Sequence, residues 1–405
     1  MIEVLESRRA RVGSVVLWVV SVTIMVLGAL HKAHRPNGND FTLYLDTAQG
    51  LLAGRHPYGV PAMFAYAYPL FLAAVLAPLT ALPRDAAIVL WCIGCVAALA
   101  YAARVAVDLA RERGLIRRGV PLTIPLVVLW FLFFDPIQSD LLNGQANFPV
   151  LLLCVLCLRA LFRGNTLGMA TSLATAIAVK ITPGLLLAFL GVRRRWGAIA
   201  LCLGLAAILV LAPLALVGQG LAPYRAYMDS FILARVRGEF LTHQGVRFSV
   251  NGVLERLAPD WGAAPWRRVL GGCLPLLGLA AVEILAGRRR SEGRDVWVFC
   301  LYLLALPLAT PMSEVHHLTY AFPALGLLLL TAVFGDAASR RRLRLGGGLA
   351  CWLLLLGGRL GRDGPWFFFG LCLLAGLVAA EAVARPASGA TEPRASGERS
   401  LAGGR

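Results

Sequence analysis

The stretch Glu6–Leu30, "ESRRARVGSVVLWVVSVTIMVLGAL", joins a basic flank to a long run that carries no charge. A run of this length can cross the hydrocarbon core of a bilayer as one helix. It is similar to a signal peptide, but no small-residue cleavage motif follows it. We therefore expect it to remain in the protein as the first membrane helix.

The composition extends this expectation to the whole chain of 405 residues. Apolar residues make up 58%, charged residues make up 15%, and the mean hydropathy is +0.71. A soluble protein of this composition would expose several hydrophobic helices to water. The net charge of +17 lies mostly in short arginine clusters between apolar runs, where arginine acts as a topology signal. The sequence thus predicts an all-α polytopic membrane protein, and it offers no charged domain for a nucleic-acid partner.

About twelve hydrophobic helical segments can be distinguished, and most of them are suited to spanning. Those suited to spanning are roughly 14–30, 86–108, 120–134, 147–162, 197–217, 267–286, 295–311, 318–334, 346–358 and 365–384. Two further segments are unusual. Tyr68–Leu82 is short and contains two prolines, and Leu167–Val192 has arginines at both ends.

The arginine clusters indicate how the chain is oriented. If both unusual segments crossed the membrane, the cluster at 111–119 would share a side with loops that lack arginine. The clusters all face the cytosol if Tyr68–Leu82 lies in the interface or re-enters, and if Leu167–Val192 is a hairpin broken at Thr182-Pro183-Gly184. All six histidines then face the external side, namely His31, His34, His56, His243, His316 and His317. We expect residues 1–384 to form one membrane domain and 385–405, rich in Pro, Gly and Ser, to be a disordered cytosolic tail.

Nine cysteines include the pairs Cys92/Cys95 and Cys154/Cys157, each with C-x-x-C spacing. In a soluble protein this spacing is typical of zinc or redox sites. Here every cysteine lies in an apolar run, where a thiolate would be costly. We expect the cysteines to pack as small apolar residues, and we expect no metal site.

Two carboxylates follow the first apolar run in "NDFTLYLDTAQG". Asp40 comes after the turn-rich "RPNGN" and begins an amphipathic stretch that suits a helix on the membrane surface. Asp40 either caps this interfacial helix or reaches lipid-linked groups as an acid or base. Asp46 lies six positions further, about 120° away on a helix that begins at Asp40, so the two carboxylates are not expected to share one reacting atom.

Other polar residues of the external side suit a carbohydrate or a phosphate. Lys180, one of only two lysines, lies deep in an apolar segment, where it either binds an anion or extends to the interface. Asn143, Gln145 and Asn147 in "NGQAN" either cap a helix or offer amides to sugar hydroxyls. His316 and His317 open a helix after "PMSE", where the helix dipole favours an anion, and Arg247 is a further potential phosphate ligand.

Several motifs resemble glycosyltransferase family 87, in the order in which they occur. They are "DFTLYLDTAQGLLAGRHPYG" from Asp40, "AYPLF" with Tyr68, "NGQANF" from Asn143, "AVKITPGLLL" with Lys180, "SVNGVLERL" with Asn251 and "PMSEVHH" with His316. The resemblance implies a GT-C-type polytopic enzyme with interfacial helices in its first external loop. It also implies a hexosyltransferase of the bacterial cytoplasmic (inner) membrane that works on the external, periplasmic side.

The resemblance further implies an inverting transfer that needs no metal and no cofactor. The donor would be a polyprenyl-monophosphate sugar, mannose above all, and the acceptor a hydroxyl of a glycolipid or glycan in contact with membrane lipids. Asp40 corresponds to the family's base, with His316 and His317 as further catalytic candidates. The expected substrate-binding residues are Tyr44, Asp46, Tyr68, Asn143, Gln145, Asn147, Lys180, Arg247 and Asn251.

Two other classes stay open at this point. About twelve apolar segments also suit a transporter or flippase of a lipid-linked or small polar substrate. Against it, the acids lie in loops and only Lys180 lies well inside a span, whereas coupled transporters place ionisable groups near the midplane. A scaffold without catalysis is the third class.

Overall fold

The computed structural model describes residues 8–36, 38–58, 66–117, 134–233, 248–257, 265–287, 291–310, 313–335, 338–360 and 366–384. Within these ranges the chain is helical and contains no strand. The longer helices are α2 (Arg8–Ala33), α3 (Asp40–Leu52), α5 (Arg84–Glu112), α7 (Phe134–Asn143), α8 (Asn147–Phe162), α9 (Thr166–Val179), α11 (Trp196–Leu211), α16 (Pro265–Gly287), α17 (Glu292–Ala309), α18 (Phe322–Phe334), α19 (Ala338–Leu360) and α20 (Trp366–Val383). The shorter elements are α4 (Leu70–Leu76), η1 (Ala77–Ala81), η2 (Thr182–Leu185), α10 (Leu186–Val192), α12 (Leu214–Val217), α13 (Ala222–Tyr227), η3 (Met228–Leu233), α15 (Val250–Leu257) and η5 (Val315–Ala321).

The all-α polytopic class is confirmed, but the count of about twelve hydrophobic helical segments is not. By length and composition, six helices of the described part can cross a membrane: Val15–Ala33, Arg84–Glu112, Trp196–Val217, Val269–Gly287, Val315–Phe334 and Trp366–Val383. A seventh span results if α7 and α8, which meet at an angle of 116°, are taken together. The expected segment at 120–134 lies almost wholly outside the described residues. The expected tail at 385–405 and the candidates His243 and Arg247 also lie outside them.

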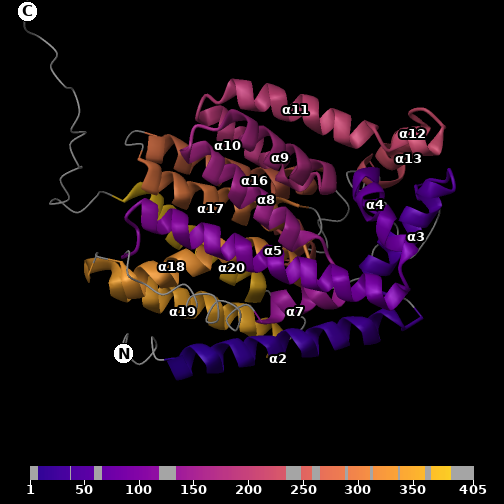
Figure 1. Ribbon diagram of the computed structural model, residues 1–405. Helices are drawn as coiled ribbons and strands as arrows, with labels where there is room; N and C mark the ends of the chain where they lie inside the picture. The colour runs from indigo at the N-terminus through magenta and orange to yellow at the C-terminus, as the bar shows by residue number, and fades with distance from the viewer. Residues whose placement is uncertain are drawn as a thin grey trace, which may run out of the picture.

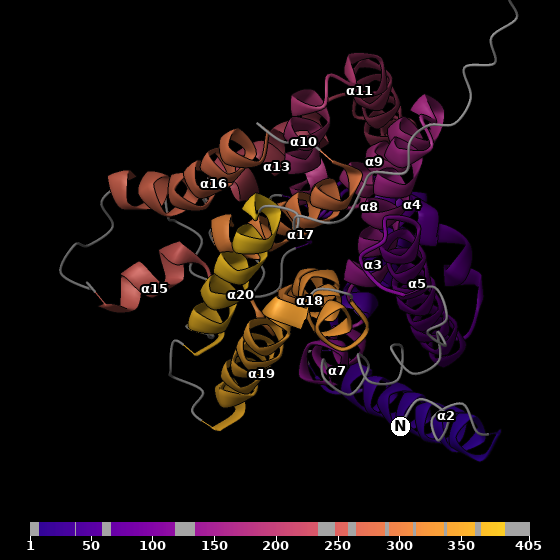
Figure 2. The same cartoon turned by 90° about the vertical axis from the view of Figure 1, so that its left-hand side faces the viewer.

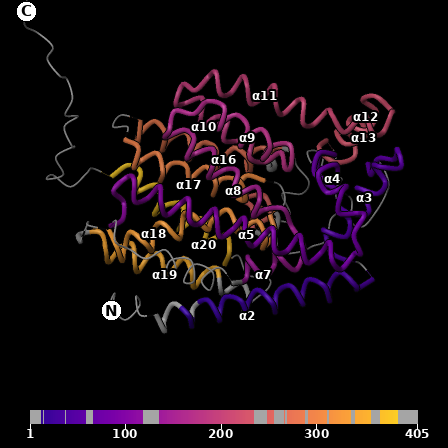
Figure 3. Tube along the Cα trace, in the orientation of Figure 1, coloured from indigo at the N-terminus to yellow at the C-terminus, as the bar shows by residue number. Residues whose placement is uncertain are grey.

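The helices form a bundle whose two ends differ. Figures 1 and 3 show α3, α4, α12 and α13 gathered at the right-hand end, whereas α2 begins and α20 ends at the left-hand end. In Figure 2, α15, α16, α19 and α20 lie on the left and α2, α5, α8 and α9 on the right, with α17 and α18 between them. The short helices of the first loop therefore cover one end of the bundle.

The segment from α9 to α10 is built from two helices too short to span alone. Thr166–Val179 and Thr182–Val192 are separated by Lys180 and Ile181, and Lys180 is extended, with φ −149° and ψ 126°. The connections α8–α9 and α10–α11 lie at the same end of the bundle in Figure 1. The segment thus folds back on itself as the hairpin interpretation requires, but the helix ends at Val179, before the Thr-Pro-Gly break suggested by the sequence.

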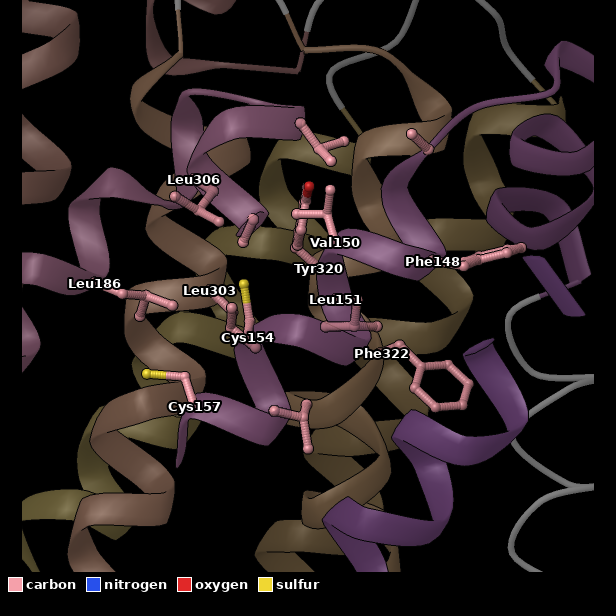
Figure 4. Close-up of a cluster of buried hydrophobic side chains, with 14 of the residues drawn as sticks. Phe148, Val150, Leu151, Cys154, Cys157, Leu186, Leu303, Leu306, Tyr320 and Phe322 are labelled. Atoms are coloured by element: carbon pink, nitrogen blue, oxygen red, sulfur yellow. The ribbon is translucent and has the colours of Figure 1, made fainter. Parts of the chain in front are cut away.

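Apolar side chains separate into a packed core and an exposed belt. Ile24 of α2, Ile208 of α11 and Leu277 of α16 are 62%, 63% and 63% exposed, as expected for side chains that face lipid. Cys154 and Cys157 of α8 are buried among apolar neighbours that include Leu186 of α10 and Leu303 of α17 (Figure 4). Both cysteines are free thiols, which agrees with their interpretation as packing residues.

Buried ion pairs connect neighbouring helices, and their arginines belong to the arginine clusters of the sequence. Arg193, at the end of α10, donates to Glu283 of α16 at 2.8 Å and to Asp295 of α17 at 2.6 Å. Arg344 of α19 pairs with Glu381 of α20 at 2.7 Å. Removing one partner of such a pair leaves an uncompensated buried charge, so these contacts hold the helices in register.

Candidate active site

A sharp turn at Gly144 creates the centre of the site. Gly144 has φ +65°, a left-handed conformation that favours glycine, and it separates α7 from α8. Its carbonyl oxygen accepts a hydrogen bond of 2.9 Å from the indole N–H of Trp91. A Cβ at this position would collide with Phe41 of α3. The turn therefore brings the amide residues of "NGQAN" against the first turn of α3.

Asp40 is the first residue of α3, but it does not cap the helix. Asn39 is the N-cap, and its side chain accepts from the Thr42 N–H at 3.0 Å within a capping box. The expectation that Asp40 might serve only as a cap is wrong, because the preceding asparagine meets that need. The Asp40 carboxylate accepts a hydrogen bond from the side-chain amide of Gln145 instead.

The surroundings of Asp40 favour its neutral form more than water would. Burial raises the pKa of the Asp40 carboxyl to about 6, and the negative charge of Glu314 acts in the same direction. The Gln145 hydrogen bond and the charges of Lys32 and Lys180 oppose this shift. The carboxylate is therefore a base with a pKa close to the pH at which it would work.

Two tyrosines fix the orientation of the Gln145 amide. Its Oε1 accepts from the Tyr68 hydroxyl at 2.7 Å and from the Tyr44 hydroxyl at 3.4 Å. The rings of Tyr44 and Tyr68 meet edge to face, with centroids 5.1 Å apart. With its oxygen held by hydroxyl donors, the amide must present its N–H groups to Asp40.

Lys180 approaches the same region from the break after α9. Its Nζ donates to Asn147 Oδ1 at 2.8 Å and lies 5.7 Å from the centre of the Tyr68 ring. The Asn147 Nδ2 donates to Asp140 Oδ2 at 2.9 Å and to the His316 carbonyl oxygen at 3.3 Å. The amide side chains of "NGQAN" do not cap α8, since its N-cap is Ala146, which makes no side-chain capping bond.

Each of the three amide side chains of "NGQAN" forms a hydrogen bond with one ionisable side chain. Asn143 Oδ1 accepts from the Nζ of Lys32, Gln145 donates to Asp40, and Asn147 accepts from Lys180. One five-residue segment therefore binds both lysines of the chain, through the amides two positions before and two positions after Gln145 in the sequence.

The two histidines differ in their surroundings. His316 is 5% exposed, and its Nδ1 lies 3.7 Å from a Glu314 carboxylate oxygen. His317 is half-buried, and its Nδ1 accepts from the Glu314 N–H at 2.9 Å as part of a capping box at the start of η5. His317 thus helps to cap η5, a role that the sequence did not suggest. His316 contacts Asn147 through its backbone carbonyl oxygen.

Two expected substrate-binding residues make their contacts elsewhere, and a third lies outside the described residues. Asp46 points to α5, where its side chain, 58% exposed, pairs with Arg84 at 3.3 Å. Asn251 is buried on α15 and packs tightly against Gly271 of α16. Arg247 lies outside the described residues.

The structure adds Asp140 and Lys32 to the candidates. Asp140 of α7 is 0% exposed, and its Oδ2 accepts from Asn147 and, at 3.1 Å, from Thr319. Its Oδ1 is buried without a hydrogen-bond partner among the described residues. The acid is visible in the sequence "DPIQSDLLNGQAN", five positions before Gln145. The sequence does not show that it is buried, or that the chain bends sharply between α7 and α8.

Comparison with known proteins gives two matches. The family model described as glycosyltransferase family 87 matches residues 66–311, more than half of the chain. This range contains Gln145, Asn147 and Lys180, whereas Asp40 and His316 lie outside it. The chain is also 29% identical over 296 residues to the polyprenol-phosphate-mannose-dependent alpha-(1-2)-phosphatidylinositol pentamannoside mannosyltransferase of Mycolicibacterium smegmatis. That alignment covers 72% of this chain and 67% of the relative.

Proposed function

Because this chain belongs to glycosyltransferase family 87, we propose that it transfers a sugar from a polyprenyl-monophosphate donor to an acceptor hydroxyl on the external face of the membrane. Family membership makes it a membrane glycosyltransferase and removes the transporter and scaffold alternatives as principal functions. The finer statement about donor and acceptor is our proposal. The name of the mycobacterial relative supports mannose as the sugar and a glycolipid as the acceptor.

The observation that carries the proposed mechanism is the position of Asp40. Its half-buried carboxylate is held by Gln145, and the two lysines bind the neighbouring amides Asn143 and Asn147. A carboxylate with a pKa of about 6 is largely ionised at neutral pH and can accept a proton. Asp40 is therefore the proposed general base.

The proposed step is a single displacement at the anomeric carbon. As Asp40 takes the proton of the acceptor hydroxyl, the acceptor oxygen forms a bond to the anomeric carbon. The bond from this carbon to the phosphate oxygen breaks, and the electron pair leaves with the polyprenyl monophosphate. Since the acceptor attacks from the face opposite the phosphate, the product has the inverted anomeric configuration.

Charge develops on the departing phosphate, and a nearby cation stabilises it. We assign this role to Lys180, because its ammonium is fixed at the edge of the cluster by a neutral amide oxygen. We assign His316 and His317 to contacts with the reacting groups. Tyr44, Tyr68, Asn143, Gln145 and Asn147 are proposed to line the sugar site.

The external side and the bacterial inner membrane remain proposals. The short helices α3 and α4 lie at one end of the bundle, and the α8–α9 and α10–α11 connections lie at the other end. This separation supports an active site on one face of the membrane. We further propose that residues 1–384 act as one domain and that 385–405 form a cytosolic tail.

Incubation of the purified protein with defined polyprenyl-phosphate sugars and a lipid acceptor extract tests the function. Mass spectrometry should detect an acceptor that has gained one hexose with polyprenyl-phosphate mannose, and the Asp40→Asn variant should form far less of it. Lys180→Ala should raise the donor KM, and Lys180→Arg should restore it only partly, because the planar guanidinium fits a different geometry. Absence of product with every donor, from a protein that is folded, would contradict the proposal.

A further inference from the structure

We propose that Asp140 is a positioning residue for the donor-phosphate site, since its carboxylate fixes the Asn147 amide and this amide holds Lys180. The inference rests on the proposed role of Lys180 in binding the phosphate. Asp140 lies in α7, Asn147 in α8, and Lys180 in the extended break after α9. Asp140 itself would touch no substrate.

The hydrogen bonds of Asn147 allow one orientation of its amide. Its Nδ2 donates to Asp140 Oδ2 at 2.9 Å and to the His316 carbonyl oxygen at 3.3 Å, so both N–H groups have acceptors. Its Oδ1 accepts from Lys180 at 2.8 Å and from the Tyr320 hydroxyl at 3.4 Å. A flipped amide would turn its N–H groups toward the ammonium and its oxygen toward the carboxylate, and both contacts would be repulsive.

Stability alone does not explain a carboxylate at position 140. The side chain is 0% exposed, and only one of its two oxygens has hydrogen-bond partners among the described residues. An ionisable group buried in this way costs stability. Its charge is balanced over a short range by Lys180, through the intervening amide of Asn147. The arrangement therefore links the Asp140 carboxylate to the Lys180 ammonium through the Asn147 amide.

Binding of polyprenyl monophosphate to the full-length protein in nanodiscs tests this role without any need for turnover. Asp140→Ala should weaken binding by about tenfold, the lower end of the loss seen when a residue that orients a metal ligand is removed. Asp140→Asn retains an oxygen that can accept from Asn147 and should lose less. Thr319→Val is the matched control, because it removes a donor at 3.1 Å from the same buried oxygen but leaves the Asn147 contact. It should weaken binding much less than Asp140→Ala does.

A double-variant cycle separates positioning from general damage to the fold. If Asp140 acts through Lys180, the double variant Asp140→Ala/Lys180→Ala should bind no more weakly than Lys180→Ala alone. Independent effects would multiply instead and would overturn the inference, as would unchanged binding in Asp140→Ala. If Asp140→Ala does not fold, the same cycle with Asp140→Asn decides the question. Unchanged binding in Lys180→Ala would refute the role of Lys180, and the transfer assay with wild-type protein would still report on the function.

Discussion

The side-chain amide of Gln145 donates a hydrogen bond to the Asp40 carboxylate across 105 positions of the sequence. This contact joins the first turn of α3 to the bend between α7 and α8. It orients the proposed base, and it brings the first turn of α3 and the amide-rich turn together.

Replacement of Asp40 by Asn should lower turnover by about a hundredfold or more while donor binding is largely retained. The variant keeps the shape of the side chain but removes its basicity, and Asn39 still caps the helix. Asp46→Asn is the control, because Asp46 is exposed and pairs with Arg84 away from the cluster, so it should retain most activity. Kinetic measurement of both variants checks this, and similar losses in the two would contradict the assignment.

The pH profile of kcat/KM should rise through about pH 6, because Asp40 accepts a proton only when it is ionised. Gln145 stabilises the ionised carboxylate and Glu314 opposes it, while Lys32 and Lys180 also favour ionisation. Gln145→Leu should therefore move the half-rise to higher pH, and Glu314→Gln should move it to lower pH. Opposite shifts support Asp40 as the group that titrates, and an identical half-rise in all three proteins would rule it out.

Gly144→Ala should destabilise the protein and reduce its activity. The left-handed backbone at φ +65° costs an alanine about 1–2 kcal/mol, and its Cβ would also collide with Phe41. Gly204 of α11 offers a matched control, since a Cβ there meets no atom within 4 Å. Thermal unfolding in detergent should show a lower Tm for Gly144→Ala and little change for Gly204→Ala. Equal Tm values would mean that the bend does not depend on glycine.

Labelling with a membrane-impermeant thiol reagent should place exposed positions on opposite sides of the membrane. Thr166→Cys and Arg195→Cys flank the α9–α10 hairpin and should share the cytosolic side, and Asp85→Cys at the start of α5 should react from outside. The exposed Cys273 and Cys372 must first be replaced. Reaction of Thr166→Cys and Arg195→Cys from different sides would refute the hairpin, and reaction of Asp85→Cys from the cytosolic side would refute the proposed orientation.

The sequence by itself determined the membrane class and the positions of most long helices. Hydropathy is a sum over neighbouring residues, so a run such as that in α2 or α11 is visible without any knowledge of its partners. The same holds for the break near Pro183, because proline limits a helix locally. Motifs of glycosyltransferase family 87 also indicated Asp40, Gln145 and Lys180 as candidates before any contact was known.

Only the tertiary structure decided what each candidate touches. It assigned the cap of α3 to Asn39, gave Asp46 a partner on α5, and placed the buried Asp140 behind Asn147. Contacts between Lys180 and Asn147, or between Asp140 and Thr319, join segments 33 and 179 positions apart. Such hydrogen bonds depend on how the helices pack and on the 116° bend between α7 and α8, and neither follows from the local pattern of apolar and polar residues.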